Sequence, residues 1–380
     1  MSDDALQVWF MPWAGLGRTF TIGPVTFWPF PSMAEARIRD QPVREHLDRY
    51  FRCYVDHSGK TVDTITVCSH ESVELRRIEP NEPEAVELRG VVDALLFSVI
   101  CSATKAAVCA DNKTMAPPSA DRYQLLRQNF TPGDEYLAVT AGSAHHIGKI
   151  PQVTFQEPWC LGGGFGYPPN KLIQGFQAVF DASFPSGARQ RLFRSLEWFR
   201  LAHTQYDEVS DLSKIVMMAT AFEILLEAGK SRRKKEWIAC ELERRCARPD
   251  SLRDSRAHRD GTRIYSKVAC WGWDFYDLRN NIAHGDEVAP GAMKYSAPGR
   301  EWLTHLIVAD LVFWECVLRE LYGRRCIGQP ARDLASKPEW KEAFPDMDQE
   351  NFVSHVAASF LGFNDVHRTL GWLPKLASTK

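Results

Sequence analysis

Hydrophobic positions in the first half of the chain have the period of strands, interrupted by longer helical stretches. Residues 18–28 alternate polar and apolar types around Gly23-Pro24, which predicts two short strands joined by a turn. Residues 61–68 alternate polar with β-branched side chains and predict a further strand. Apolar spacing and start signals predict helices over residues 37–54 and 83–107. We therefore expect residues 1–185 to form one mixed α/β domain.

After residue 185 the apolar positions recur every three or four residues, which is the period of amphipathic helices. The second helical stretch, residues 211–228, is apolar on nearly every side and is typical of a helix buried in a bundle. Helices are predicted over residues 188–206, 211–228, 234–247, 265–279 and 301–322, with a polar loop over 248–262. The expected fold class is α+β: the mixed domain is followed by an antiparallel helical bundle over 186–330 and a helical extension over 331–380.

The composition is that of an ordinary globular protein, with 380 residues, 25% charged residues and a net charge of −2. This balance gives no support to a protein that coats nucleic acid through its overall charge, although a local basic site remains compatible with it. The ten cysteines form no Cys-x-x-Cys pair, and we expect no metal site and no cofactor.

The pattern also bears on localisation. The start of the chain, MSDDALQVWF, lacks the basic and apolar regions of a signal peptide. The longest apolar stretch, residues 91–103, contains Asp93 and is too short to cross a bilayer. We expect a cytoplasmic protein that does not enter a membrane.

The segment 274–285 contains the most informative group of polar residues. Arg279 and His284 are five residues apart, so on an ideal helix their side chains would point about 140° apart. Asn280 and His284, four apart, would share a face. The segment is therefore either a helix end, where Arg279 can swing, or half of a site that a second copy completes.

This segment resembles the Arg-Asn-x-x-x-His motif of HEPN domains. The Ala221-Phe222-Glu223-Ile224-Leu225 stretch and the arginine-rich residues 191–199 are similar to the Apea-like branch of that family, and the resemblance covers about residues 188–325. It implies a helical bundle that pairs as a homodimer and a metal-independent endoribonuclease, plausible in antiphage defence or as a toxin. The family also includes inactive members that bind or act as scaffolds, so a non-catalytic dimerisation and RNA- or nucleotide-binding module is the alternative.

The three motif residues fit RNA cleavage chemically. Cleavage needs a base for the 2′-hydroxyl and an acid for the leaving 5′-oxygen, and histidine can do either near neutral pH. Arginine suits the extra negative charge that develops on the phosphate. The candidate catalytic residues are therefore Arg279, Asn280 and His284, with Asn280 orienting His284 or donating to a phosphate oxygen.

Each of these residues also has a structural interpretation. Arg279 could cap its helix and pair with Asp277 or Asp286, and His284 could simply pack. Glu223 lies in an apolar helix and needs a partner, which favours a supporting salt bridge to Arg279 or Arg191 over a catalytic role. A basic run is either a solvated helix start or an RNA-phosphate contact. It comprises Lys230, Arg232, Arg233, Lys234 and Lys235.

The remaining features favour structural roles. His145-His146 and the glycine run 162–166 lack the neighbours of a metal site or a phosphate loop. The aromatic residues of 271–276 are expected in the core or at a dimer interface. We expect residues 1–185 to control activity through an unidentified trigger ligand or protein.

Overall fold

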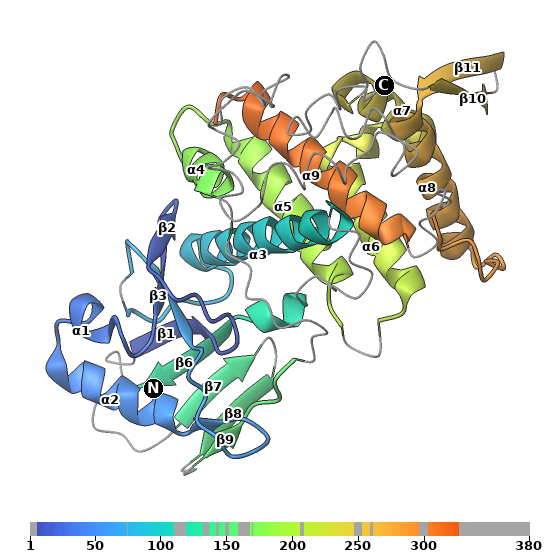
Figure 1. Ribbon diagram of the computed structural model, residues 1–380. Helices are drawn as coiled ribbons and strands as arrows, with labels where there is room; N and C mark the ends of the chain where they lie inside the picture. The colour runs from blue at the N-terminus through green and yellow to red at the C-terminus, as the bar shows by residue number, and fades with distance from the viewer. Residues whose placement is uncertain are drawn as a thin grey trace, which may run out of the picture. The chain divides into compact units, whose positions relative to one another are not determined.

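The chain divides into two compact units in the computed structural model (Figure 1). The first unit contains Met1–Leu96 and Pro118–Tyr167, and the second contains Phe97–Pro117 and Pro168–Lys380. The structure describes residues 6–73, 75–109, 119–131, 137–141, 144–148, 152–158, 168, 170–205, 209–246, 253–258, 261–295 and 303–326. The α+β class is confirmed. The predicted extension over 331–380 and the glycine run 162–166 lie outside the described residues, as do the side chains of His145 and His146.

A seven-stranded sheet with antiparallel pairing throughout forms the first unit. The strands are β1 (Leu6–Met11), β2 (Phe20–Ile22), β3 (Val25–Pro29), β5 (Thr66–His70), β6 (Leu126–Phe130), β7 (Leu137–Ala141) and β8 (Ala144–Gly148). Their order is β2-β3-β5-β1-β6-β7-β8. The hairpin predicted within residues 18–28 is confirmed, and the strand predicted over 61–68 lies a few residues later, as β5.

Helix α2 (Gln41–Arg52) packs its apolar face into the core of this unit, where Phe10, Phe51 and Tyr54 form an aromatic cluster. The Asp40 side chain caps the helix by accepting from the amide of Val43. Smaller elements complete the unit: α1 (Ala34–Arg37), a 3₁₀ turn (Ala120–Tyr123) and the parallel pair β4 (Tyr54–Val55) and β9 (Val153–Thr154).

The second unit is helical, and the five helices predicted over residues 188–322 are confirmed. They are α5 (Ser186–Ala202), α6 (Asp211–Leu225), α7 (Lys234–Cys246), α8 (Lys267–His284) and α9 (His305–Gly323), and their ends differ from the prediction by up to five residues. Helix α4 (Asn170–Ala178) was not predicted, and a 3₁₀ turn lies at Ala228–Lys230. Helix α6 contacts α5, α8 and α9, and this position explains why it is apolar on most sides (Figure 1).

The observed division differs from the predicted boundary at residue 185. Helix α3 (Pro83–Cys109) contributes its residues from Phe97 onward to the helical unit, and α4 belongs there too. The physical reason is aromatic packing, since the fully buried Phe97 ring lies against Phe199 and Phe313.

The loop predicted over 248–262 is wrong in its central part. Residues there form an antiparallel hairpin of β10 (Arg253–His258) and β11 (Gly261–Ser266). The hairpin is polar because neither strand has a buried face along its whole length. Helix α8 follows it directly, with the Ser266 side chain accepting from the amide of Ala269.

Several further expectations are settled by burial. Trp271, Trp273, Phe275 and Tyr276 are buried in the core of their own unit. Of the eight cysteines that can be described, five are buried and Cys240 is exposed. In the part of the chain that the structure describes, no helix has both the length and the apolar character needed to span a bilayer.

Candidate functional site

The motif residues occupy the last two turns of α8. The helix continues five residues past Arg279 and ends at Gly285, whose φ of 76° is the left-handed conformation that closes many helices. Arg279 therefore does not lie at a helix end, and the interpretation in which it swings toward His284 is wrong. Within one straight helix the two side chains diverge by about 140°.

Burial separates the motif residues further. Arg279 and Asn280 are half-buried, whereas His284 is exposed as the last residue of α8. The Arg279 guanidinium donates from Nη1 to Oδ1 of Asn280 at 3.3 Å. Asn280 thus accepts from the arginine, a contact that was not among its two predicted roles of orienting His284 or donating to a phosphate oxygen.

Glu223 on α6 is the centre of a polar cluster that fixes Arg279. Its Oε1 accepts from the Tyr276 hydroxyl at 2.6 Å and lies 3.4 Å from Nη2 of Arg279. Its Oε2 accepts from Nζ of Lys234 at 2.6 Å. We call Glu223, Lys234, Tyr276 and Arg279 the Glu223 cluster. The predicted salt bridge between Glu223 and Arg279 is confirmed.

The alternative partner, Arg191, pairs elsewhere, with Glu227 and Glu320. Of the two arginines considered as partners for Glu223, only Arg279 pairs with it. Its side chain is only 11% exposed, so the pairing also compensates the loss of water around the carboxylate.

Tyr276 is a member of the site that the sequence interpretation assigned to the core or to a dimer interface. It lies three residues before Arg279, so both side chains lie on the same side of α8. The guanidinium carbon of Arg279 is 5.4 Å from the centroid of the tyrosine ring. Burial, followed by the hydrogen bond to the Glu223 carboxylate, raises the pKa of Tyr276, which keeps its hydroxyl a proton donor. The i, i+3 spacing was the signal that could have identified it.

The basic run before and within α7 divides into two kinds of side chain. Lys234 pairs with Glu223, and Lys235 donates to both oxygens of Asp277 at 2.7 and 3.0 Å. Arg232 and Arg233 are exposed, and Arg233 pairs with Glu236. The side chain of Lys230 lies outside the described residues.

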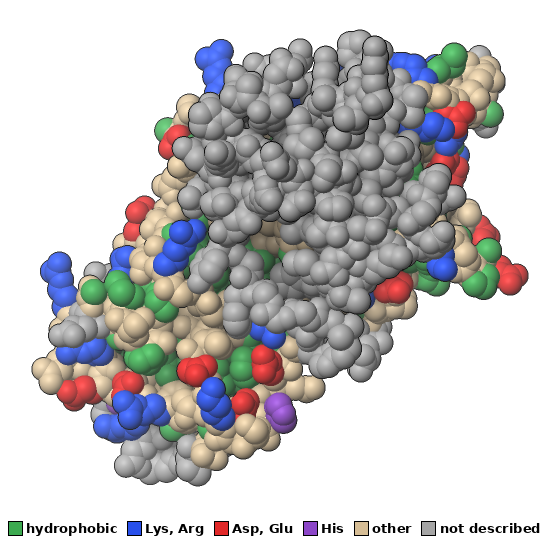
Figure 2. All heavy atoms as spheres, in the orientation of Figure 1, with side chains coloured by type: hydrophobic (Ala, Val, Ile, Leu, Met, Phe, Trp, Pro, Cys, Tyr) green, Lys and Arg blue, Asp and Glu red, His purple; other side chains and the backbone are tan. Residues whose placement is uncertain are grey.

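This division limits the RNA-phosphate interpretation of the run. The two lysines would have to leave carboxylates before they could bind phosphate, whereas the two arginines already face solvent. Figure 2 shows acidic and basic side chains interspersed over the described surface that it displays, without one large basic patch.

Among the residues that can be described, no group of three or more His, Cys, Asp or Glu side chains is arranged to hold a metal ion. Comparisons with protein-family models, curated proteins and solved structures found no match to this chain. The geometry of α6, α7 and α8 is therefore the basis on which a function is assigned.

Proposed function

We propose that this protein is a metal-independent endoribonuclease whose active site is completed by two copies of the chain, as its resemblance to the Apea-like HEPN domains implies. One observation carries the proposal. Arg279 is held in place by Glu223 and Asn280, while His284 is exposed on a different side of the same helix. A single copy thus presents the two groups in different directions, and a second copy is needed to bring an arginine and a histidine to one phosphate.

The proposed reaction uses only side-chain chemistry. One His284 takes the proton from the RNA 2′-hydroxyl, whose oxygen attacks the neighbouring phosphorus. The bond from phosphorus to the 5′-oxygen breaks, and the His284 of the other copy gives that oxygen a proton. The products are a 2′,3′-cyclic phosphate and a free 5′-hydroxyl. Arg279 stabilises the additional negative charge on the phosphate.

The other members of the Glu223 cluster have a positioning role in this proposal. Glu223 holds Arg279 from α6, while Tyr276 donates to one oxygen of its carboxylate and Lys234 to the other. Glu223 is nearly buried, so the proposed mechanism gives it no direct contact with RNA.

One of the two sequence features that favoured a homodimer, the aromatic residues near the motif, no longer supports it. The aromatic residues of 271–276 are buried within one chain, so they do not supply a dimer interface. The divided geometry of Arg279 and His284 supports the dimer on its own. All motif residues lie in the second unit, which supports a controlling role for the first unit.

Labelled RNA incubated with the purified full chain in excess EDTA tests the proposal. We expect cleavage that leaves a 2′,3′-cyclic phosphate, because the proposed groups are a histidine pair and an arginine pair. Cleavage that stops on chelation, or products with a 5′-phosphate, would contradict this chemistry.

A non-catalytic dimerisation and RNA- or nucleotide-binding module is the second candidate. It is favoured by the pairing of Arg279, Lys234 and Lys235 with carboxylates, since such pairs also serve a purely structural purpose. RNA binding by a folded dimer without any cleavage would establish this second candidate instead.

A further inference from the structure

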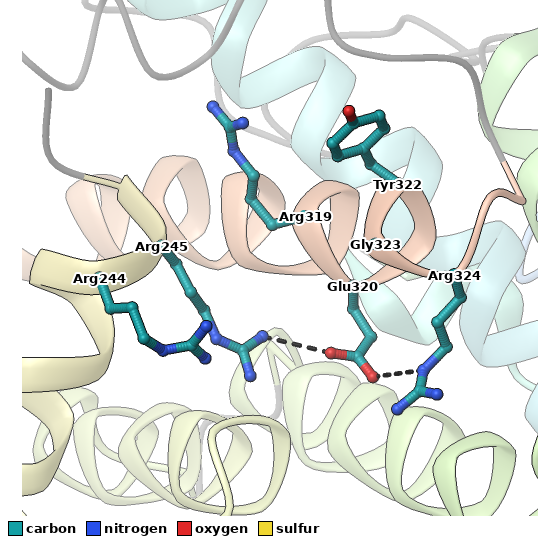
Figure 3. A pocket seen from close by; sticks show the side chains of 7 residues that line it. All are labelled: Arg244, Arg245, Arg319, Glu320, Tyr322, Gly323 and Arg324. Carbon is teal, nitrogen blue, oxygen red and sulfur yellow. Dashed lines mark hydrogen bonds and ion pairs between the residues drawn. The ribbon is translucent and has the colours of Figure 1, made fainter.

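A second concentration of arginines lies at the C-terminal ends of α7 and α9, away from the Glu223 cluster. It surrounds a pocket of about 410 Å³. The charged and aromatic side chains that line the pocket are Arg244, Arg245, Arg319, Glu320, Tyr322 and Arg324 (Figure 3). Lys234 of that cluster and Arg244 of the pocket are ten residues apart on α7, so the two sites are about 15 Å apart along the helix.

Glu320 organises the guanidinium groups around this pocket. Its Oε1 accepts from Nη2 of Arg191 and from Nε of Arg324, each at 2.8 Å. Its Oε2 accepts from Nη1 of Arg245 at 3.3 Å. These arginines come from α5, from α7 and from the end of α9, so one carboxylate holds three guanidinium groups from separate segments together.

Burial by itself would raise the pKa of Glu320. The hydrogen bond from Arg324 and the charges of Arg245, Arg324 and Arg191 outweigh that effect and hold the pKa below its ordinary value. The carboxylate therefore stays ionised and keeps its arginines in place at neutral pH.

Among the described residues, the pairing around Glu320 leaves positive charge in excess. Arg191, Arg244, Arg245 and Arg324 pair with Glu227, Glu241 and Glu320, so four positive charges meet three negative ones. Arg319 is matched separately by Glu315. An arginine at the C-terminal end of a helix also offsets the partial negative charge there, which accounts singly for Arg245 in the last turn of α7 and Arg324 directly after α9. It does not account for a pocket between them.

Unused hydrogen-bond donors remain on two of these arginines. Among the described residues, Nη2 of Arg245 and both Nη groups of Arg324 have no hydrogen-bond partner. The guanidinium carbon of Arg324 lies over the Phe184 ring, 5.3 Å from its centroid. Figure 3 shows Arg245 and Arg324 reaching Glu320 from its two sides.

We propose that this pocket binds the phosphate group of a phosphorylated small molecule. Phosphate oxygens are the acceptors that planar guanidinium groups bind best, and two oxygens can meet one guanidinium at once. The excess positive charge has the sign that attracts a phosphate group, and the volume is within the range of small-molecule sites. The inference does not depend on the proposed nuclease activity, because none of the lining residues belongs to the Glu223 cluster.

Calorimetric titration of the full chain with inorganic phosphate, pyrophosphate and ATP tests this site. We expect saturable binding, with pyrophosphate or ATP tighter than phosphate. Tight binding of both pyrophosphate and ATP assigns the pocket to the phosphate chain itself, and tight binding of ATP alone assigns it to a nucleotide.

The variants decide where these ligands bind. Arg324→Gln removes the positive charge and the two unused Nη groups from a partly exposed side chain and should weaken binding by about tenfold or more. Arg245→Lys keeps the charge but loses the planar fork and should also weaken it. Arg253→Gln, on the hairpin, is the matched control and should bind as the wild type does. Binding by none of the three probes, or equal affinity in the wild type and Arg324→Gln, would overturn the proposal.

Discussion

His203, the residue after α5, has an environment that is suited to a charged imidazole. Its Nδ1 lies 2.7 Å from the carbonyl oxygen of Phe199 and its Nε2 lies 2.9 Å from Oδ1 of Asp310. The Phe199 carbonyl can only accept a hydrogen bond, and so can an ionised Asp310, so a ring protonated on both nitrogens satisfies both neighbours. The second oxygen of Asp310 accepts from Thr104 at 3.2 Å. A buried ion pair therefore joins α3, α5 and α9 within the helical unit.

This pair makes stability depend on pH. Burial by itself lowers the pKa of His203, but the charge and hydrogen bond of Asp310, with the Phe199 carbonyl, outweigh it and raise that pKa, while Lys214 opposes them weakly. A raised pKa in the folded state contributes stability that is complete below about pH 6.5 and is lost as pH rises through the folded value.

We expect His203→Gln to lower the melting temperature most at pH 6, with the difference from the wild type shrinking toward pH 9. Differential scanning calorimetry of both proteins across this range measures it. A difference that stays constant with pH would show that the imidazole is neutral in the folded protein.

The Tyr276 hydroxyl is a second buried group whose removal has a defined effect. Tyr276→Phe keeps the ring but leaves Oε1 of Glu223 with one donor fewer. We expect a loss of about 1–2 kcal/mol in the free energy of unfolding, since a hydrogen bond to a charged group is broken. Tyr322→Phe is the matched control, because no hydrogen bond of its hydroxyl to a described residue is present. Equal denaturation midpoints for the two variants would remove Tyr276 from the cluster.

At the scale of elements, helices of the second unit were predictable because their apolar spacing and end signals are local. The end of α8 was not predictable in the same way, although Gly285 stands directly after it, since the apolar pattern stops near Leu278 while the helix continues to His284.

The hairpin of β10 and β11 was missed because its strands lack a buried face, and burial on one face is what makes strands recognisable. Gly261, with a φ of 119° at its turn, was the available signal.

The contact between α7 and α8 depends on the missing side chain of Gly272. A Cβ atom at this position would lie 2.3 Å from Cδ1 of Leu242, which is fully buried. Alanine favours a helix over glycine by up to about 1 kcal/mol, whereas overpacking a core costs about 1–3 kcal/mol. We expect Gly272→Ala to destabilise the protein by about 1–2 kcal/mol in urea denaturation.

The shorter side chain of Leu242→Val supplies the control. It lacks the carbon that the new Cβ would meet, so Leu242→Val should cost less in the Gly272→Ala background than in the wild type. Additive effects of the two substitutions would mean that the helices separate without this contact.

At the scale of the molecule, the division of the chain was the part that the sequence predicted least well. The hydrophobic pattern of the sequence becomes helical after residue 185. The core of the helical unit nevertheless includes Phe97, which comes from a helix that starts in the first unit. Such a long-range contribution has no local signal in the sequence. The Glu223–Arg279 bridge was predictable because a lone carboxylate in an apolar helix requires a positively charged partner, and the sequence offered few candidate arginines in or near the motif.

This division predicts how fragments behave. A fragment of residues 186–380 lacks Phe97 and α4, so it exposes the rings that Phe97 covers on Phe199 and Phe313. We expect it to melt without a cooperative transition and to bind a hydrophobic dye, as states with incomplete packing do. A cooperative transition at the melting temperature of the full chain would show that the helical unit does not need these residues.

The nuclease proposal depends most directly on His284. Its side chain is exposed, so His284→Ala should leave the melting temperature nearly unchanged, as surface substitutions do. His57→Ala, at an exposed histidine of the first unit, is the matched control for both measurements.

Cleavage of labelled RNA in EDTA and the melting temperature should be measured on the same preparations of the wild type and both variants. We predict that His284→Ala lowers the cleavage rate by about 10²–10⁴-fold without loss of fold, while His57→Ala cleaves as the wild type does. A folded His284→Ala protein that cleaves at the wild-type rate would contradict the proposed function.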